Sequence, residues 1–343
     1  MSTHYHLVIP DLFLPKEIAA DACAGLQLPA LEKLLARARP EPLLADTPEA
    51  WLYGTFGVDG QAIAPITLRA DGMEPGSAFW LRADPVHLRV QRDQLVLQPE
   101  VLLNEDEAAQ LCAALNAHFA DERLRFFALN PQRWYLQLDV EPDMLMHPLA
   151  QVAGKNVHAY LPQGQDALRW HGVFNEIQML FYEHAVNQAR EARGELPINS
   201  VWLWGGGRAG GRLERPFTRI YGNGALVEAF ARVAGIPCAV LPDNVSDCFD
   251  DEEMGNESDD VLLVWEGLQR AIQHGDIHAW RTSLQHFEQC CAAQLLGALR
   301  AGRIAQLTLD VLNSGTACRF VLTRGAAWKL WRRQKRLAYY ALV

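Results

Sequence analysis

The segment Asn199–Gly211 combines residue types that suit an anion. It reads NSVWLWGGGRAGG, and the candidate ligand-binding residues in it and just after it are Gly205, Gly206, Gly207, Arg208 and Arg212. Backbone N–H groups of a glycine turn and guanidinium groups both bind phosphate or carboxylate oxygens. The spacing matches neither the GxGxxG of a dinucleotide-binding turn nor the GK[ST] ending of a P-loop. The segment therefore predicts either an anion site at a strand end or a plain flexible turn.

Two further groups of polar residues could line a site. His184, Asn187 and Arg190 are spaced three apart within a predicted helix over Leu168–Arg193, so they share roughly one helix face. Polar residues on one helix face usually point to solvent. His87 alternates with apolar neighbours in ADPVHLRV and could reach into a cleft between domains.

Composition argues against several classes of protein. The 343 residues carry a formal net charge of −10, and half of them are hydrophobic. This charge repels a phosphate backbone, so we expect no nucleic acid partner. The start of the chain lacks a basic region before an apolar stretch, and no window approaches the length of a membrane span. The seven cysteines form no CxxC pair. We expect a cytoplasmic protein that binds no membrane.

The order of predicted elements indicates two domains. A buried strand over His4–Pro10 opens the chain and is followed by a helix near Leu28–Ala38. Residues 77–139 read as an α+β segment, with Asn104 capping a helix. From Asn199 onward strands alternate with helices, which is typical of a mostly parallel sheet with helices on both faces.

Two charge runs carry alternative interpretations. The segment Asp243–Asp260 is rich in carboxylates but lacks the ligand positions of a calcium-binding EF-hand loop, which favours a solvated acidic loop. The segment Trp328–Arg336 is basic and contains two tryptophans. We expect it to dock on the protein by its aromatic face, with a protein-interaction surface as the alternative.

A longer pattern points to a family. The segment Asn175–Gly207, NEIQMLFYEHAVNQAREARGELPINSVWLWGGG, closely resembles part of the archaeal-type, cofactor-independent phosphoglycerate mutases, with their His-x-x-Asn-x-x-Arg pattern and W-G-x-G. A weaker resemblance covers almost the whole chain, including HLVIPDLFLP and WLRADPVHLRV. The resemblance implies an alkaline-phosphatase-like, three-layer α/β domain with a mostly parallel sheet, formed by residues 1–75 and 200–343. A smaller α+β cap domain, residues 76–199, would be inserted in it.

The same resemblance implies a metal centre, and most of that centre is missing. The family uses two divalent metals and a serine or threonine nucleophile. Its ligands are matched by Asp11, His274 and Asp310. We expect no cofactor, with a residual divalent metal (Mn²⁺, Zn²⁺ or Mg²⁺) on these three residues as the alternative. Without a metal, Asp11 would cap a loop and His274 a helix, and a buried Asp310 would need a partner, for which Arg270 is the candidate.

The remaining positions depart from the family pattern. Ala45 stands where the nucleophilic serine is expected, before Asp46, and Thr47 is a shifted substitute. Arg270 and Val311 replace a ligand aspartate and a ligand histidine. Two dications held close together need several carboxylates and imidazoles to offset their charge. Phosphoryl transfer by the family's route is therefore not expected.

An intact helix and glycine signature beside a degenerate metal site resembles the bacterial RpfE-type regulatory proteins. We therefore predict a non-catalytic regulatory protein, a pseudoenzyme, that binds a small anionic metabolite or a regulatory protein in the interdomain cleft. The resemblance also raises His184, Asn187 and Arg190 as groups that pack or bind near the glycines. The alternative is a metal-dependent phosphotransferase, phosphoglycerate mutase-like or phosphatase-like, with ligands rearranged among Asp46, Thr47, His87 and the acidic loop.

Overall fold

The computed structural model describes residues 3–58, 60, 62–98, 101–249, 259–313, 316–329 and 331–341. The chain divides into two compact units, Met1–Gly57 with Leu213–Val343, and Val58–Arg212. The inserted unit therefore begins before residue 76 and ends after residue 199, unlike the expected domain. The reason is that both flanking segments pack within it, as described below.

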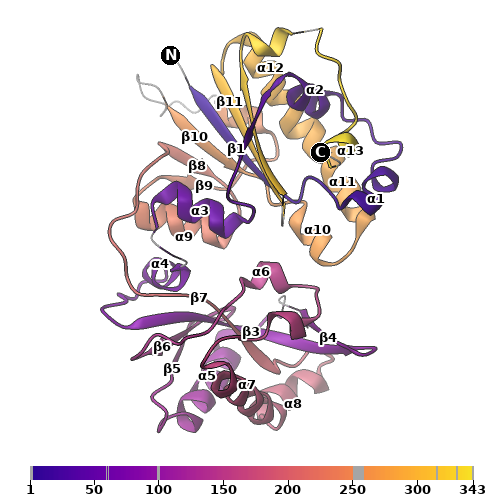
Figure 1. Cartoon of the computed structure of the whole chain (residues 1–343). Coiled ribbons are helices and arrows are strands. Elements are labelled where there is room, and N and C mark those ends of the chain that lie inside the picture. The colour runs from indigo at the N-terminus through magenta and orange to yellow at the C-terminus, as the bar shows by residue number, and fades with distance from the viewer. Residues whose placement is uncertain are drawn as a thin grey trace. The chain divides into compact units, whose positions relative to one another are not determined.

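The first unit contains the mostly parallel sheet that the sequence predicts. Its strands, among the described residues, run in the order β2-β12-β11-β1-β10-β8-β9 (Figure 1). They are β1 His4–Pro10, β2 Arg39–Pro42, β8 Arg219–Tyr221, β9 Cys238–Ala239, β10 Asp260–Val264, β11 Gln306–Asn313 and β12 Thr316–Thr323. The pairs among β11, β1, β10, β8 and β9 are parallel, and β12 is antiparallel to both β11 and β2. The α/β class is confirmed.

Helices cover both faces of this sheet (Figure 1). One face carries α1 Lys16–Ala22, α2 Pro29–Arg37, α10 Gln269–Gln273, α11 Ile277–Phe287, α12 Ala293–Ala301 and α13 Leu337–Tyr340; α3 Pro48–Phe56 and α9 Ala225–Ala234 lie on the other. A π-helical segment, Glu288–Ala292, joins α11 to α12, and 3₁₀ turns span Val245–Phe249 and Ala326–Trp328. Side chains alternate along β1, so Tyr5, Leu7 and Ile9 enter the apolar core, whereas His4 and His6 point to the opposite face.

The second unit has its own sheet. Its strands run β4-β3-β6-β5, with β7 also paired to β3. They are β3 Phe79–Gln91, β4 Gln94–Gln98, β5 Arg125–Asn130, β6 Arg133–Leu138 and β7 Ser200–Gly207. The helices are α4 Ile63–Ala70, α5 Glu105–His118, α6 Leu149–Val152, α7 Ala167–Tyr182 and α8 Ala185–Ala192, with a 3₁₀ turn at Val157–Tyr160. Asn104 caps α5 in a capping box with Glu107, as its position predicts.

Strand β7 corrects one topological prediction. The alternation of strands and helices assigns it to the parallel sheet, but it lies antiparallel to β3, with Ser200 opposite Val86. The long β3 offers an edge within the second unit, and α4 also packs against β7. The chain therefore returns to the first unit after β7 and not before it.

The predicted helix Leu168–Arg193 is broken. His184 adopts an extended conformation between α7 and α8, and its Nδ1 accepts a hydrogen bond of 3.2 Å from the N–H of Val186. Burial lowers the pKa of His184, which favours the neutral ring that this bond requires. His184 is therefore an N-cap residue and does not share a helix face with Asn187 and Arg190.

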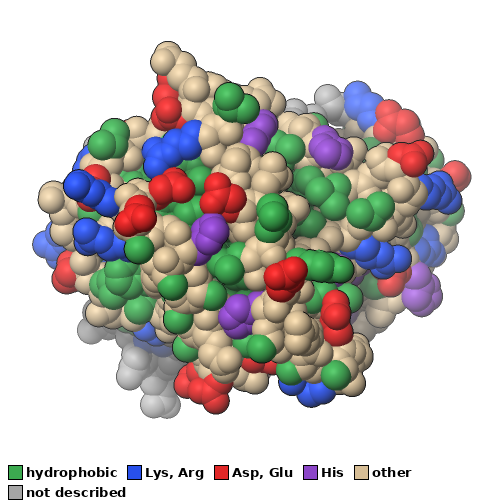
Figure 2. Space-filling model, turned by 90° about the horizontal axis from the view of Figure 1, so that it is seen from below, with side chains coloured by type: hydrophobic (Ala, Val, Ile, Leu, Met, Phe, Trp, Pro, Cys, Tyr) green, Lys and Arg blue, Asp and Glu red, His purple; other side chains and the backbone are tan. Residues whose placement is uncertain are grey.

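Side chains of different kinds are mixed on one face of the molecule (Figure 2). On the face drawn in Figure 2, described acidic, basic and hydrophobic side chains are interspersed, and neither sign of charge forms a continuous patch. Exposed hydrophobic side chains on α7 include Leu168, Met179 and Tyr182. In the part of the chain that the structure describes, no helix combines the length and apolar character of a membrane span.

Candidate functional site

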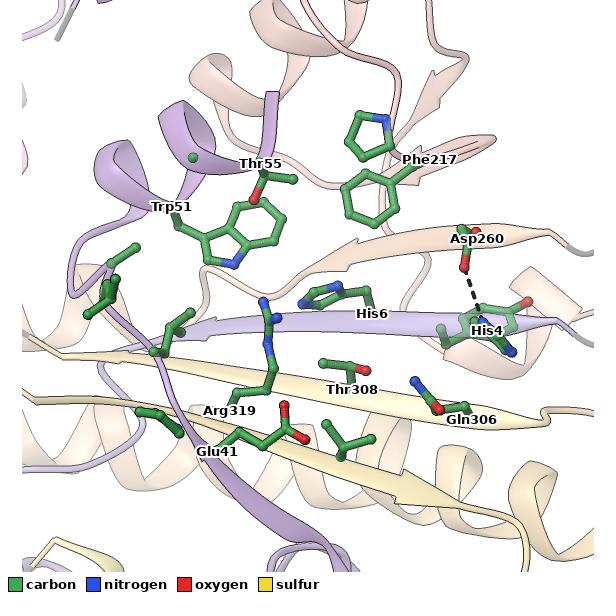
Figure 3. Close-up of a pocket in the computed structure, with 18 of the residues that line it drawn as sticks. His4, His6, Glu41, Trp51, Thr55, Phe217, Asp260, Gln306, Thr308 and Arg319 are labelled. Atoms are coloured by element: carbon green, nitrogen blue, oxygen red, sulfur yellow. Dashed lines mark ion pairs between the residues drawn. The ribbon is translucent and has the colours of Figure 1, made fainter. Parts of the chain in front are cut away.

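A cavity of about 850 Å³ lies on the face of the first unit's sheet that carries His4 and His6 (Figure 3). Strands β1, β2, β10, β11 and β12 all supply polar side chains to it, including Gln306 and Thr308. Trp51 and Thr55 from α3 and Phe217 from the segment before β8 line the side facing them (Figure 3). All of these residues belong to the first unit.

A buried carboxylate lies beneath this cavity. Asp310 is fully buried, and its two oxygens accept bonds of 2.7 Å from Nε and of 2.7 Å from Nη2 of Arg319. They also accept bonds of 2.7 Å from Nε2 of His6 and of 2.6 Å from Nε1 of Trp51. Burial alone would raise the pKa of Asp310, but the bonds from Arg319, His6 and Trp51 outweigh it and hold this pKa well below its usual range. Asp310 is therefore ionised.

The partner of Asp310 differs from the one expected. Arg319 lies directly opposite Asp310 on the antiparallel neighbour β12, which brings the two side chains to the same face. Arg270, the predicted partner, is an exposed residue of α10. The sequence prediction failed because it had no strand register with which to pair β11 and β12.

His6 is fixed in orientation by the same network. Because Asp310 is ionised, Nε2 of His6 carries the proton that it donates. The ring packs edge-on against Trp51, with centroids 5.4 Å apart, and against Phe217, with centroids 5.7 Å apart. Sequence reasoning missed this residue, although HYHLVIP contains a signal: the two histidines at alternate positions share one strand face.

The other charged residues of the cavity are also paired. His4 faces Asp260 at 3.3 Å (Figure 3), and Arg39 bonds to Glu41. Among the described residues in and beneath the cavity, there are thus two arginines and three carboxylates. They are Arg39, Arg319, Glu41, Asp260 and Asp310. The cavity combines a charged floor with an aromatic wall and can hold a polar organic ligand through hydrogen bonds.

A second group of carboxylates lies where the parallel strands end, the edge at which α/β sheets usually bind ligands. Burial raises the pKa of Glu49 in the first turn of α3 and that of Glu266 after β10, the latter to about 7. The charge of Glu49 adds to the shift of Glu266, and that of Asp11 adds to the shift of Glu49. Sequence reasoning identified only Asp11 here.

The three expected metal ligands are not brought together. Asp11 follows β1 with φ of 57°, and Asp310 is enclosed by its hydrogen bonds. His274 ends α10 as an exposed residue whose Nδ1 lies 2.8 Å from the carbonyl oxygen of Arg270. Among the described residues, no group of three or more His, Cys, Asp or Glu side chains is arranged to hold a metal ion. Of the alternative ligands, Thr47 caps α3, and half of the acidic loop, residues 250–258, lies outside the described residues.

The glycines have a packing role that the sequence does not reveal. Gly205, Gly206 and Gly207 end strand β7 and do not form a turn. A Cβ at Gly206 would lie 2.6 Å from Leu81 Cδ2, and one at Gly207 only 2.3 Å from the Cβ of Ala62. Close approach of the strand to Ala62 therefore requires glycine at position 207, whereas at position 206 the ends of neighbouring side chains would have to shift. Arg208 donates to the carbonyl oxygen of Ser77, and Arg212 is exposed.

The other predicted ligand-binding residues make structural contacts. Asn187 is buried and bonds through its side chain to the backbone of Phe181 and Ile198. Arg190 is buried and pairs with Glu107 at 2.8 Å, because the start of α5 packs against the end of α8. His87 Nδ1 lies 2.8 Å from the carbonyl oxygen of Pro197.

The second unit also contains a buried charge network. Asp84 on β3 accepts bonds of 3.1 and 2.6 Å from Nε and Nη2 of Arg82 and a bond of 2.7 Å from Nε1 of Trp204. The guanidinium also lies over the rings of Tyr135 and Trp204. This network lies within WLRADPVHLRV and the glycine segment, so the family-like motifs here build a closed core.

Comparison with known proteins gives a consistent family relationship. The chain is 29% identical over 219 residues to a probable 2,3-bisphosphoglycerate-independent phosphoglycerate mutase of Geobacter sulfurreducens, covering 60% of this chain and 54% of the relative. It is 28% identical over 137 residues to a 2,3-bisphosphoglycerate-independent phosphoglycerate mutase of Methanosarcina acetivorans, covering 39% and 34%. The chain thus spans about half the length of the first relative and about a third of the second. These similarities support homology to the cofactor-independent phosphoglycerate mutases.

A solved structure supports the fold. A protein of Pyrococcus horikoshii is 12% identical, with a TM-score of 0.58, and the superposition covers 99% of this chain and 92% of that protein. No family model matches the chain. The α/β fold with its mostly parallel sheet is consistent with an alkaline-phosphatase-like domain.

Proposed function

We propose that this chain is a non-catalytic relative of the cofactor-independent phosphoglycerate mutases. In this proposal it acts in regulation, as the resemblance to RpfE-type proteins implies, by binding a small anionic metabolite or a protein partner. The observation that carries the proposal is the state of Asp310. Its carboxylate, which the resemblance matches to a metal ligand, already bonds to Arg319, His6 and Trp51.

The charge of Arg319 gives the physical reason. A guanidinium stays protonated in proteins, so a dication at Asp310 would meet a fixed positive charge 2.7 Å from the carboxylate oxygens. Moving Asp310 from Arg319 to a metal would also break two charge-assisted hydrogen bonds and leave the guanidinium, which is 33% exposed, without its carboxylate partner. In this proposal Asp310 therefore stabilises the fold and orients the residues at the floor of the cavity, and it does not bind a metal.

The cavity is the proposed site for a small ligand. It lies directly above the Asp310 network, and Arg319 and His6 belong to both. A charged group that is half inside a protein and half facing a cavity binds a ligand more strongly than the same group in bulk water, because fewer water dipoles screen it. The residues named for anion binding in the glycine segment do not line this cavity.

A metal-dependent phosphotransferase remains the second candidate function. The observation that favours it is the group Asp11, Glu49 and Glu266 at the ends of the parallel strands, because carboxylates are ligands for divalent metals. A metal would have to draw these side chains into a different arrangement from the one observed.

Elemental analysis of protein purified without chelators, paired with thermal unfolding in Mn²⁺, Zn²⁺ and Mg²⁺, separates the two candidates. We expect no stoichiometric metal and no rise in melting temperature with any of the three ions, since a ligand that prefers the folded state must raise it. Two equivalents of tightly held metal, lost in the Asp11→Ala variant, would overturn the non-catalytic proposal.

A further inference from the structure

The free edge of the Arg319 guanidinium identifies the class of ligand. We propose that the cavity above Asp310 binds a small organic monocarboxylate, with its carboxylate on Nη1 of Arg319 and its apolar body along the aromatic wall. This inference rests on the proposed function only in taking the cavity as a ligand site. It adds the chemical group that is recognised and the residue that recognises it.

Arg319 has donors to spare in the direction of the cavity. Its Nε and Nη2 both bond to Asp310, in the side-on arrangement typical of arginine with a carboxylate. Among the described residues, Nη1 is left with two N–H groups and no recorded acceptor, and one third of the side chain is exposed, at 33%. Figure 3 shows Arg319 rising from β12 toward Trp51, with Thr308 on the neighbouring strand. A planar carboxylate matches the end-on pair of parallel donors formed by one N–H of Nη1 and the N–H of Nη2 that does not bond to Asp310.

The charge of the cavity favours a single negative charge over two. Asp310 already neutralises Arg319, and Glu41 and Asp260 contribute two more carboxylates against the one remaining arginine, Arg39. No surplus of positive charge is therefore available, so a phosphate dianion would add two uncompensated negative charges near three carboxylates. A carboxylate brings half that charge and can be satisfied by the hydrogen bonds of Nη1 and of neighbouring polar side chains.

The walls indicate an organic ligand larger than a simple ion. The cavity volume of about 850 Å³ lies within the usual range for small-molecule sites. Trp51 and Phe217 present nearly parallel rings, 14° apart in plane, along one side. Pro42, Leu43 and Pro216 add apolar surface. A ligand with an apolar or aromatic body would exclude water from these groups while its acid group stays at the floor.

Three probes that share a phenyl ring distinguish the charge classes. Phenylacetate carries one charge, phenylacetamide none and phenyl phosphate two at pH 7.5. Isothermal titration of the full chain, treated with a chelator, should show phenylacetate binding at least about tenfold more tightly than either of the others, since a charge-assisted hydrogen bond is worth about that factor. Equal or tighter binding of phenyl phosphate or of phenylacetamide would overturn the inference, as would no binding of phenylacetate at millimolar concentration.

A matched pair of variants tests the location without disturbing the charge network. Gly54 lines the cavity from α3, and a Cβ added there meets no atom within 4 Å. Gly297, on α12, is an exposed helical glycine of the same unit with equally open space. Gly54→Leu should therefore project a side chain into the cavity and weaken phenylacetate binding at least about tenfold, whereas Gly297→Leu should bind as the parent does. Unchanged binding by a folded Gly54→Leu variant would place the ligand elsewhere and contradict the inference.

The Arg319→Lys variant tests the recognising residue. A lysine keeps the charge but loses the planar pair of donors, so phenylacetate affinity should fall at least about tenfold. Unchanged affinity would show that Nη1 is not the recognising group. All these results are dissociation constants measured without metal, whereas the proposed function fails on metal content and turnover. Each can therefore fail while the other stands.

Discussion

The two units contain the same trio of side chains in two different settings. In each, an aspartate accepts two bonds from an arginine and one from a tryptophan indole: Asp310 with Arg319 and Trp51, and Asp84 with Arg82 and Trp204. In the second unit the arginine side chain is only 6% exposed and lies over two aromatic rings. In the first unit it is 33% exposed, lies beside a cavity and shares its aspartate with His6.

This difference separates structure from candidate function. A closed Arg–Asp pair can only stabilise or specify the fold, because no ligand can reach it. An open pair keeps donors that a ligand can use. The motif WLRADPVHLRV and the glycine segment lie around the closed network, which explains why these two motifs do not lead to the cavity. The following variants test this contrast, from the largest expected effect to the smallest.

Arg82→Met should be the most damaging substitution. It leaves Asp84 as a buried charge with only Trp204 as a recorded side-chain donor, and removing one partner of a buried ion pair costs about 3–5 kcal/mol. Urea unfolding should show this loss in the free energy of unfolding. Arg208→Met, an exposed arginine of the same unit, is the matched control and should change it by less than about 1 kcal/mol. Similar losses in the two variants would contradict the closed-network description.

Glu266 tests a partly buried carboxylate for which the described residues record no arginine partner. Its pKa of about 7, compared with about 4.5 when unfolded, means that the folded state prefers the protonated form. Stability is therefore greatest below the unfolded pKa and falls as the pH rises toward 7. Glu266→Gln should remove this loss, adding about 3 kcal/mol at pH 8 and little at pH 4.5. A pH-independent effect in urea unfolding would argue against the raised pKa.

Arg319→Met should cost less than Arg82→Met. Asp310 would keep two donors, His6 and Trp51, and water can enter from the cavity to solvate the carboxylate. We expect a loss of about 2 kcal/mol in the free energy of unfolding. The difference between the two arginine variants measures how open the first network is, and its disappearance would remove the distinction between the units.

Glycine variants sharpen the contrast at the level of packing. Gly207→Ala places a Cβ against Ala62 and should cost about 1–2 kcal/mol in the free energy of unfolding, measured with urea. This outcome follows from strand packing and needs no ligand. If the variant is as stable as the parent, the close approach of β7 does not require glycine.

Gly54→Ala should have the smallest effect and the opposite sign. Gly54 is helical, and an added Cβ faces open space beside the cavity. The gain in helix propensity should raise the free energy of unfolding by about 0.5–1 kcal/mol. A loss measured in the same urea series would mean that the space beside α3 is filled.

Local signals in the sequence predicted many elements but not their partners. The capping box at Asn104 and the apolar strand His4–Pro10 depend on residues close in the chain, and both were found. The pairing of Asp310 with Arg319 depends on the register between β11 and β12, and the position of β7 depends on a free edge of β3. Such long-range choices are set by packing of the whole sheet. The alternation of side chains in HYHLVIP nevertheless indicates that His6 lies on the strand face opposite the apolar core, which is the face that Asp310 shares.

The most direct test of the non-catalytic proposal is a turnover assay. The purified chain, supplied with Mn²⁺, Zn²⁺ or Mg²⁺, should neither interconvert the phosphoglycerates nor hydrolyse a phosphomonoester above the rate of a metal-only blank. A homologous active mutase assayed in parallel shows that the conditions support the reaction. Metal-dependent turnover by this chain that disappears in Asp11→Ala, with the variant still folded, would contradict the proposal.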